Sequence, residues 1–233
     1  MSLKDLRQDL RAAADPERAL AMQRFFKTGK GQYGEGDIFI GLSVPASRLV
    51  AKKYAGLPLQ DVQNLLHSSI HEERLVALLI LVQRFKRDPE GVALFYLDNL
   101  AWVNNWDLVD LTAPCILGAY LEKRDRSFLY RLAKSNTLWE RRIAIIATLH
   151  FIRQGDYSDT LKITKIFLHD EHDLIHKATG WMLREVGKRD INVEEAFLAN
   201  HCKEMPRTML RYAIEKLPEK KRQAYMKGGM PIP

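Results

Sequence analysis

The chain has 233 residues, and its 46% hydrophobic content can fill the core of one large or two small domains, which excludes a disordered chain. It carries 36 Lys and Arg against 29 Asp and Glu, so its net charge of +7 favours an acidic partner such as nucleic acid. A soluble protein that is merely basic is the alternative.

Two features favour a soluble, cytoplasmic protein. The segment from Met1 to Leu20 is charged throughout, and the longest strongly apolar run, Leu75 to Val82, is far too short to span a bilayer. Cys115 and Cys202 have neither paired nor CxxC spacing, so we expect free thiols in a reducing compartment.

Apolar residues recur at helical spacing along nearly the whole chain, whereas strand patterns are almost absent. Prolines interrupt this pattern at Pro16, Pro45, Pro58, Pro89, Pro206 and Pro218. The clearest predicted helices cover residues 71–85, 137–152, 172–187 and 206–217. We therefore expect an all-α protein.

These four helices share a core in which a cation is followed by an alanine and then by bulky apolar residues. The alanines are Ala77, Ala144, Ala178 and Ala213, at intervals of 67, 34 and 35 residues. A period in the thirties is typical of an α-helical solenoid of HEAT-like or TPR-like repeats. We expect one such domain over residues 1–225, curved with a basic concave face, and a flexible tail over 226–233.

A cation lies one to three residues before each aligned alanine, and the four are Arg74, Arg142, Lys177 and Arg211. We expect these side chains to line one face of the solenoid as a groove for DNA. Arg184, Lys27 and Lys30 are further candidates for DNA contact. For any single cation, an ordinary solvated or intra-repeat ion pair is the alternative.

Aromatic and charged residues are paired at helical spacing in two places. Trp106 and Asp110 are four residues apart in WVNNWDLVDL, so on a helix both side chains project from one face. Trp181 and Arg184 share a face in the same way. A carboxylate flanked by aromatic rings, with cations beside it, is suited to hold a positive charge next to an anionic partner.

Each of these residues also has a structural interpretation. Tryptophans are more often core residues than site residues, because they bury a large area. Asp110 could cap a helix or pair with Arg142, which would fit a scaffold.

The stretch from Trp102 to Asp190 resembles the AlkD-like DNA alkylation repair family, which are HEAT-like-repeat DNA glycosylases. The resemblance rests on NNWDLVD, LWERRIAI and KATGWMLREVGKRD in the expected order and spacing, with weaker similarity in FIGLSVPASR. It implies that Asp110 is the catalytic carboxylate, that Trp106 and Trp181 contact the sugar, and that Arg142 contacts the DNA backbone. The glycine-rich segment of residues 28–37 is longer than its counterpart in the best-known branch.

The resemblance further implies base excision repair of double-stranded DNA that contains 3-alkyl- or 7-alkylpurines, by hydrolysis of the N-glycosidic bond. No cofactor or metal is implied, and we expect a monomer. Because the alkylated base is cationic and leaves as a neutral molecule, the protein must stabilise the oxocarbenium-like sugar and direct a water onto it. The family contacts the sugar and backbone of the lesion without a tight base-flipping pocket.

Other functions stay open at this point, namely a non-catalytic HEAT-like binder of damaged or branched DNA and a protein–protein adaptor. Gly29, Gly31 and Gly34 spell GxGxxG, but they follow a helical pattern rather than a strand, which favours a flexible loop over a dinucleotide site. His172 and His176 have a spacing found in metal sites, but their acidic neighbours more simply open a helix.

Overall fold

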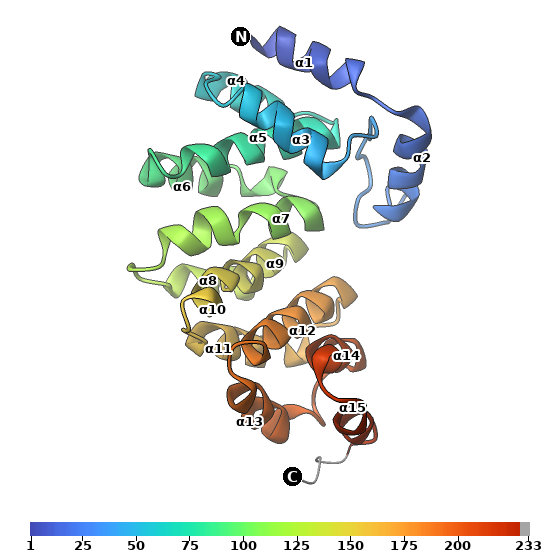
Figure 1. Ribbon diagram of the computed structural model, residues 1–233, viewed down its shortest axis with the longest axis vertical. Helices are drawn as coiled ribbons and strands as arrows, with labels where there is room; N and C mark the ends of the chain where they lie inside the picture. The colour runs from blue at the N-terminus through green and yellow to red at the C-terminus, as the bar shows by residue number, and fades with distance from the viewer. Residues whose placement is uncertain (229–233) are drawn as a thin grey trace. The chain divides into compact units, whose positions relative to one another are not determined.

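A computed structural model of the chain describes residues 1–228 (Figure 1). These residues form α-helices joined by turns, and their only β pairing is a single parallel bridge between Ile38 and Ile70. The all-α helical-repeat architecture confirms the predicted fold class. No helix among the described residues combines the length and apolar character that a membrane crossing requires.

Internal contacts divide the chain into two compact units, residues 1–116 and 117–233. The single domain expected over residues 1–225 stays a prediction beside this division. Of the tail expected over 226–233, Met226 is the last residue of a helix, and residues 229–233 lie outside the described part.

The first unit is built around one buried helix, α5, which contacts α3, α4, α6 and α7. All residues from His71 to Leu81 are buried, so from Leu75 onwards the helix is apolar on all sides, whereas its first turn buries charged side chains. The helices of this unit are α1 (Leu3–Ala12), α2 (Pro16–Phe25), α3 (Val44–Lys53), α4 (Leu59–Leu66), α5 (His71–Arg84), α6 (Pro89–Asp98) and α7 (Trp106–Thr112).

The second unit is built around α12, which contacts α9, α10, α11, α13 and α14. Gly180 lets α12 approach α14 closely, because a Cβ at this position would lie 2.3 Å from the carbonyl oxygen of Met209. The helices are α8 (Ser127–Ala133), α9 (Leu138–Ala147), α10 (Leu149–Arg153), α11 (Ser158–Ile166), α12 (Asp173–Gly187), α13 (Ile191–His201), α14 (Arg207–Ala213) and α15 (Glu219–Met226).

The six prolines that interrupt the apolar pattern all lie at helix beginnings. Pro16 and Pro89 are the first residues of α2 and α6, and Pro45 is the second residue of α3. The other three precede the first residues of α4, α14 and α15. These are the positions where a missing N–H costs no helical hydrogen bond.

The four helices predicted most clearly are confirmed as α5, α9 with α10, α12 and α14. The alanines on which they were aligned are all buried, in keeping with a small residue where one helix crosses another. The predicted helix over residues 137–152 is divided in two at Thr148, whose hydroxyl donates to the carbonyl oxygen of Ile145.

Candidate functional site

The helix α7 carries the candidate catalytic residues Trp106 and Asp110 on adjacent turns. It begins at Trp106, whose backbone N–H donates to the side-chain oxygen of Asn105 at 2.8 Å. Asp110 follows one turn later and is half-buried, so its carboxylate is not sealed in the interior. A π-helical turn over Pro114–Gly118 follows α7, because Pro114 has no N–H to donate to the carbonyl oxygen of Asp110.

The indole of Trp106 belongs to an aromatic cluster contributed by the end of α2. The ring of Phe26 stacks on it with centroids 4.9 Å apart and planes 7° apart, and Phe25 meets it edge-on at 5.8 Å. Phe26 is buried, whereas Phe25 is 64% exposed. One face of the candidate sugar-contacting indole is therefore covered by a phenylalanine that the sequence motif does not include.

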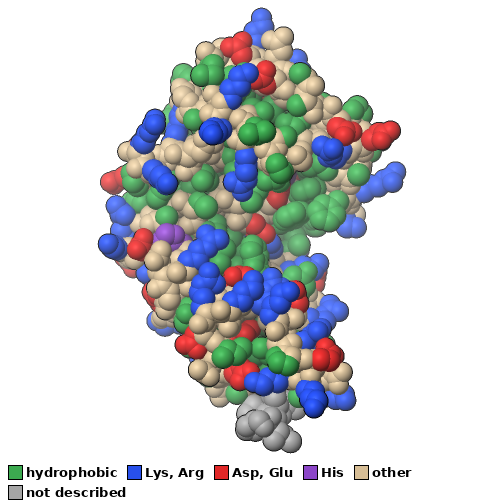
Figure 2. Space-filling view, in the orientation of Figure 1, with side chains coloured by type: hydrophobic (Ala, Val, Ile, Leu, Met, Phe, Trp, Pro, Cys, Tyr) green, Lys and Arg blue, Asp and Glu red, His purple; other side chains and the backbone are tan. Residues whose placement is uncertain are grey.

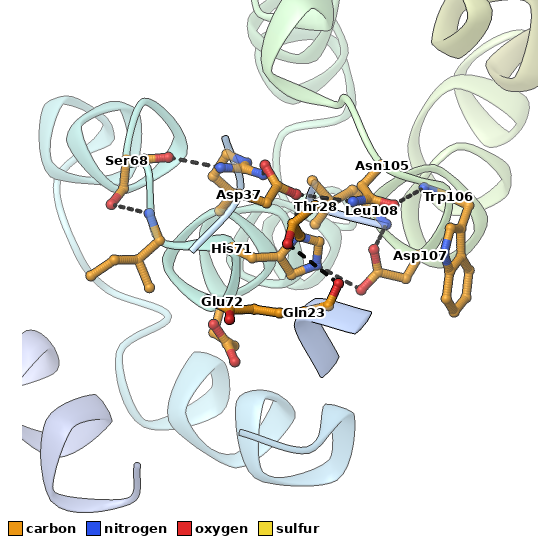
Figure 3. A network of polar contacts seen from close by, with 12 residues as sticks. Gln23, Thr28, Asp37, Ser68, His71, Glu72, Asn105, Trp106, Asp107 and Leu108 are labelled. Atoms are coloured by element: carbon orange, nitrogen blue, oxygen red, sulfur yellow. Dashed lines mark hydrogen bonds and ion pairs between the residues drawn. The ribbon is translucent and has the colours of Figure 1, made fainter. Parts of the chain in front are cut away.

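A buried polar cluster lies behind this aromatic group and ties three segments together (Figure 3). His71, the first residue of α5, is fully buried, and its two ring nitrogens contact carboxylates on opposite sides. Nδ1 lies 3.0 Å from Oδ2 of Asp37, and Nε2 lies 2.9 Å from Oδ2 of Asp107. Asp37 ends the glycine-rich segment, and Asp107 is in the first turn of α7.

Two more side chains complete the cluster around Asp37. Arg74 donates to its Oδ1 at 2.6 Å, and Asn105 donates to its Oδ2 at 2.9 Å. Burial raises the pKa of the Asp37 carboxyl, but the hydrogen bond from His71 and the charge of Arg74 outweigh burial and hold this pKa below its usual value. Asp37 is thus an ionised carboxylate in the interior.

The charge of His71 follows from the same contacts. Burial lowers the pKa of its imidazole, yet the charge of Asp107 and the hydrogen bonds that the ring donates to both carboxylates outweigh burial and raise this pKa to about 9. At neutral pH the ring is therefore an imidazolium between two carboxylates, the state in which both ring nitrogens can donate.

A third buried carboxylate, that of Glu72, holds the segment that follows Asp37. Glu72 is fully buried, and its Oε1 accepts the backbone N–H groups of Ile40, Gly41 and Leu42 at 3.1, 2.8 and 3.2 Å. Gly41 has φ of +88°, and a Cβ there would lie 2.1 Å from the carbonyl oxygen of Asp15. This loop places Phe39 against the rings of Phe26 and His71.

In the second unit, Trp181 and Arg184 lie on α12 as expected, and both are half-buried. The indole N–H of Trp181 donates to Glu185 at 3.2 Å. Burial raises the pKa of Glu185, but hydrogen bonds from Lys188, Arg189 and Trp181 outweigh it and lower this pKa below its usual value. Trp181 is therefore held by an ionised neighbour one turn away.

The candidate cations differ in how they are placed. Arg142 is 5% exposed and donates from Nη1 to the carbonyl oxygen of Leu174. Arg184 forms an ion pair with Glu215, and Lys177 forms one with Asp173 at 2.7 Å. Three other candidates, Arg211, Lys27 and Lys30, are exposed.

The expectation that Arg74 lines a DNA-binding surface does not fit the structure. Arg74 is only 3% exposed, and its guanidinium donates to Asp37 and to the carbonyl oxygen of Ser68. Like the other aligned cations, Arg74 precedes its alanine by a few residues, but its acidic partner comes from a distant segment. Its charge balances a buried carboxylate and is unavailable to a phosphate.

The positive charge is distributed unevenly between the two units. Residues 1–116 contain 14 Lys and Arg and 14 Asp and Glu, whereas residues 117–233 contain 22 against 15, so the second unit alone accounts for the net charge of +7. Figure 2 shows Lys and Arg side chains spread over the visible face of the second unit, in the lower part of the view, with acidic side chains among them. The second unit is thus the part with an electrostatic preference for a polyanion.

Two segments with alternative interpretations are now placed. The glycine-rich residues 28–37 form successive hydrogen-bonded turns, in which Gly34 donates to the carbonyl oxygen of Lys27 and Asp37 to that of Gly34. The segment is thus a run of turns whose last residue, Asp37, is held by the buried cluster, and its expected flexibility stays a prediction. His172 caps α12 by accepting from the N–H of Leu174, and no three potential metal-ligating side chains among the described residues are grouped to hold an ion.

Sequence reasoning missed the members of the buried cluster, in particular His71, Asp37 and Asp107. The histidine before an acidic pair at the beginning of α5 gave little indication of such a cluster. The aspartate that ends the glycine-rich run gave a clearer indication, because a carboxylate at that position can anchor the loop. Phe26 was missed because its partners, Trp106 and Phe39, come from two other segments.

Comparisons with known proteins identify the fold and the family of the chain. No curated protein matches the sequence. A solved structure described as a predicted DNA alkylation repair enzyme from Enterococcus faecalis shares the fold, with a TM-score of 0.71 and 19% identity over 88% of this chain and 97% of that one. The family model for DNA alkylation repair enzymes matches residues 6–217. The chain therefore belongs to the DNA alkylation repair enzyme family.

Proposed function

We propose that the protein is a DNA glycosylase that removes cationic 3-alkyl- and 7-alkylpurines by hydrolysing the N-glycosidic bond. The observation that carries this proposal is the helix α7, which presents Trp106 and Asp110 on adjacent turns in a chain of the alkylation repair family. Asp110 is half-buried, so a carboxylate there is reachable yet partly shielded from water. Trp181 and Arg142 belong to the proposed site by their match to the family motif.

The chemistry assigned to Asp110 is electrostatic. An alkylated purine is already a good leaving group, so the barrier lies in the positive charge that develops on the sugar. A carboxylate about 4 Å from that charge stabilises it by roughly 4 kcal/mol at an effective dielectric near 20. The same carboxylate can orient the attacking water. The indole of Trp106 adds about 0.5–2 kcal/mol through its π-face, so it ranks behind the aspartate.

The partner in this proposal is double-stranded DNA, and its phosphates are contacted mainly by the second unit, which carries the net positive charge. Arg211, Lys177 and Arg184 are the candidate contacts there, with Lys27 and Lys30 in the first unit. Arg74 is left out because its buried guanidinium is paired with the Asp37 carboxylate. We further propose that the protein acts as a monomer in the cytoplasm.

The decisive experiment measures release of methylated purines from alkylated duplex DNA by the native protein and by Asp110→Asn. The substitution keeps the shape and removes the charge, so we expect single-turnover excision to fall by about a thousandfold, the equivalent of roughly 4 kcal/mol. The dissociation constant for the same DNA should change by less than about twofold, because binding of the DNA before the reaction does not depend on this charge. Asp98→Asn, at an exposed position that ends α6, is the matched control.

Other outcomes of this experiment identify the competing functions. Native protein that binds damaged duplex tightly without releasing any base would be a non-catalytic binder. Binding to DNA should weaken with salt at a log–log slope of about −0.9 per neutralised phosphate. A weak and salt-insensitive association would instead favour an adaptor, and either result would refute the glycosylase proposal.

A further inference from the structure

The buried cluster around His71 is balanced in charge and lies next to Trp106, but the proposed chemistry does not use it. Two carboxylates, Asp37 and Asp107, face two cations, His71 and Arg74. All four are almost completely buried. A buried ion cluster of this kind is weak evidence for stability alone, since apolar residues of similar size often serve as well. Stability alone therefore does not explain why an ion cluster is buried beside Trp106.

The geometry fixes the protonation state of the imidazole. Both ring nitrogens lie within 3.0 Å of carboxylate oxygens, and an ionised carboxylate can only accept hydrogen bonds. Both nitrogens therefore have to donate. A neutral imidazole has one donor, so it can satisfy only one of the two carboxylates.

Both carboxylates that hold His71 are connected to the beginning of α7. Asp107 belongs to the first turn of the helix and also accepts the N–H of Leu108. Asp37 reaches the same turn through Asn105, which donates to Asp37 and accepts the N–H of Trp106. Figure 3 shows these residues converging on the first turn of α7.

The aromatic rings provide a third connection from His71 to Trp106. The ring of Phe26 lies 5.1 Å from the imidazole and stacks on the indole of Trp106 at 4.9 Å. Phe39 stacks on the imidazole at 4.4 Å. A displacement of His71 would therefore move the indole of Trp106 in two ways, through the backbone of Trp106 and through the stacked ring of Phe26.

We propose that His71, held as an imidazolium between Asp37 and Asp107, is a positioning residue that sets the place of the Trp106 indole and thereby the rate of base excision. The part that concerns rate rests on the proposed function, whereas the part that concerns the indole does not. Loss of the ring proton would release one carboxylate, so the indole should move when His71 is deprotonated. The charged groups that face the imidazole are Asp37, Asp107 and Arg74.

Fluorine NMR of protein labelled with 5-fluorotryptophan tests this directly. The chain has four tryptophans, and each resonance can be assigned by substituting one tryptophan with phenylalanine. In His71→Gln, which keeps one donor and loses the charge, we expect the Trp106 resonance to shift or broaden. Single-turnover excision should fall by about tenfold or more, since misplaced contacts slow chemistry, while the dissociation constant for DNA stays within about twofold.

His67→Gln is the matched control. His67 lies four residues before His71, is exposed, and stacks on Trp102 with centroids 4.5 Å apart. The same chemical change at this position should move the Trp102 resonance and leave that of Trp106 and the excision rate unchanged. A general loosening of the first unit would move both resonances in both variants.

The native protein gives a second test that does not depend on the folding of a variant. Its Trp106 resonance should titrate with a midpoint near pH 9, the pKa of His71, and this titration should be absent from the resonance of Trp139 in α9. A Trp106 resonance that stays constant from about pH 7.5 to about pH 10.5 in folded protein overturns the proposal. So does a folded His71→Gln with a native Trp106 resonance.

The two proposals fail in distinguishable ways. If the native protein releases no alkylated base, the glycosylase function is wrong, but the fluorine spectra still decide whether His71 places the indole. If excision occurs and the spectra do not respond, the positioning role alone is wrong.

Discussion

Replacing Glu72 with glutamine should clearly destabilise the first unit, although the two side chains have nearly the same shape. The carboxylate of Glu72 is fully buried and accepts the N–H groups of three successive residues, Ile40, Gly41 and Leu42. Glutamine can place its carbonyl oxygen where Oε1 lies, so the three contacts can persist. They would then be neutral hydrogen bonds, and the amide nitrogen would face the N–H of Ile40 in place of Oε2, which now accepts from it.

The size of the effect follows from those contacts. A hydrogen bond to a charged group contributes about 1.5–3 kcal/mol and a neutral one about 0.5–1.5 kcal/mol, so each of the three weakens by about 1 kcal/mol. The total loss is therefore about 3 kcal/mol, a large part of the 5–15 kcal/mol that typically stabilises a folded protein. At about 2–4 °C per kcal/mol for a chain of this length, the Tm should fall by about 6–12 °C.

Urea unfolding of native protein, Glu72→Gln and Glu90→Gln measures this loss. Glu90 is exposed in the first turn of α6, so its substitution should change the unfolding free energy by less than about 0.5 kcal/mol. Tryptophan fluorescence should report the transition in part through Trp106, because Phe39 on the Glu72-bound loop packs on Phe26 and Phe26 packs on Trp106. A Glu72→Gln variant as stable as Glu90→Gln would refute the view that the charge of Glu72 holds this loop.

Two further outcomes concern the second unit and the substrate. Burial raises the pKa of Glu194 from its ordinary value of 4.5 to about 8. Between pH 4.5 and pH 8 the folded protein therefore keeps a proton that the unfolded chain releases. The stability of the protein consequently falls as the pH rises through this interval. Glu194→Gln should therefore be more stable than native protein at pH 8 by about 1 kcal/mol or more, and equal urea midpoints at pH 5 and pH 8 for native protein would contradict this assignment. If excision proceeds without a closed base pocket, a timed assay should show release of a bulky 7-alkylguanine within about tenfold of the rate for 7-methylguanine. A tenfold difference corresponds to a barrier difference of roughly 1.4 kcal/mol. Release of the methylated base alone would count against an open site.

Part of the candidate site could be predicted because it depends only on the spacing of residues along a helix. Trp106 and Asp110 are one helical turn apart, and so are Trp181 and Arg184, which places each pair on one face once the segments are known to be helical. The identity of these residues as site residues came from a family resemblance and not from periodicity. Their roles in catalysis stay predictions that the Asp110 experiment tests.

The interpretation of Arg74 was wrong for a reason that local spacing cannot reveal. Like Arg211, it lies within three residues of the aligned alanine that follows it, yet Arg74 is buried against Asp37 while Arg211 is exposed. The partner lies 37 residues away in a glycine-rich segment that was expected to be loose. A cation in a helical pattern does not disclose whether a distant carboxylate will neutralise it.

The sequence by itself determined the four clearest helices, the breaks in the helical pattern at prolines and the all-α repeat architecture, because helical periodicity and backbone chemistry depend on residues within a few positions of one another. Only the tertiary structure decided which charges are buried, what covers Trp106, and how His71 joins Asp37 to Asp107. Those contacts link residues more than thirty positions apart, and their energies depend on burial and on exact donor and acceptor distances, which exist only when the chain is folded.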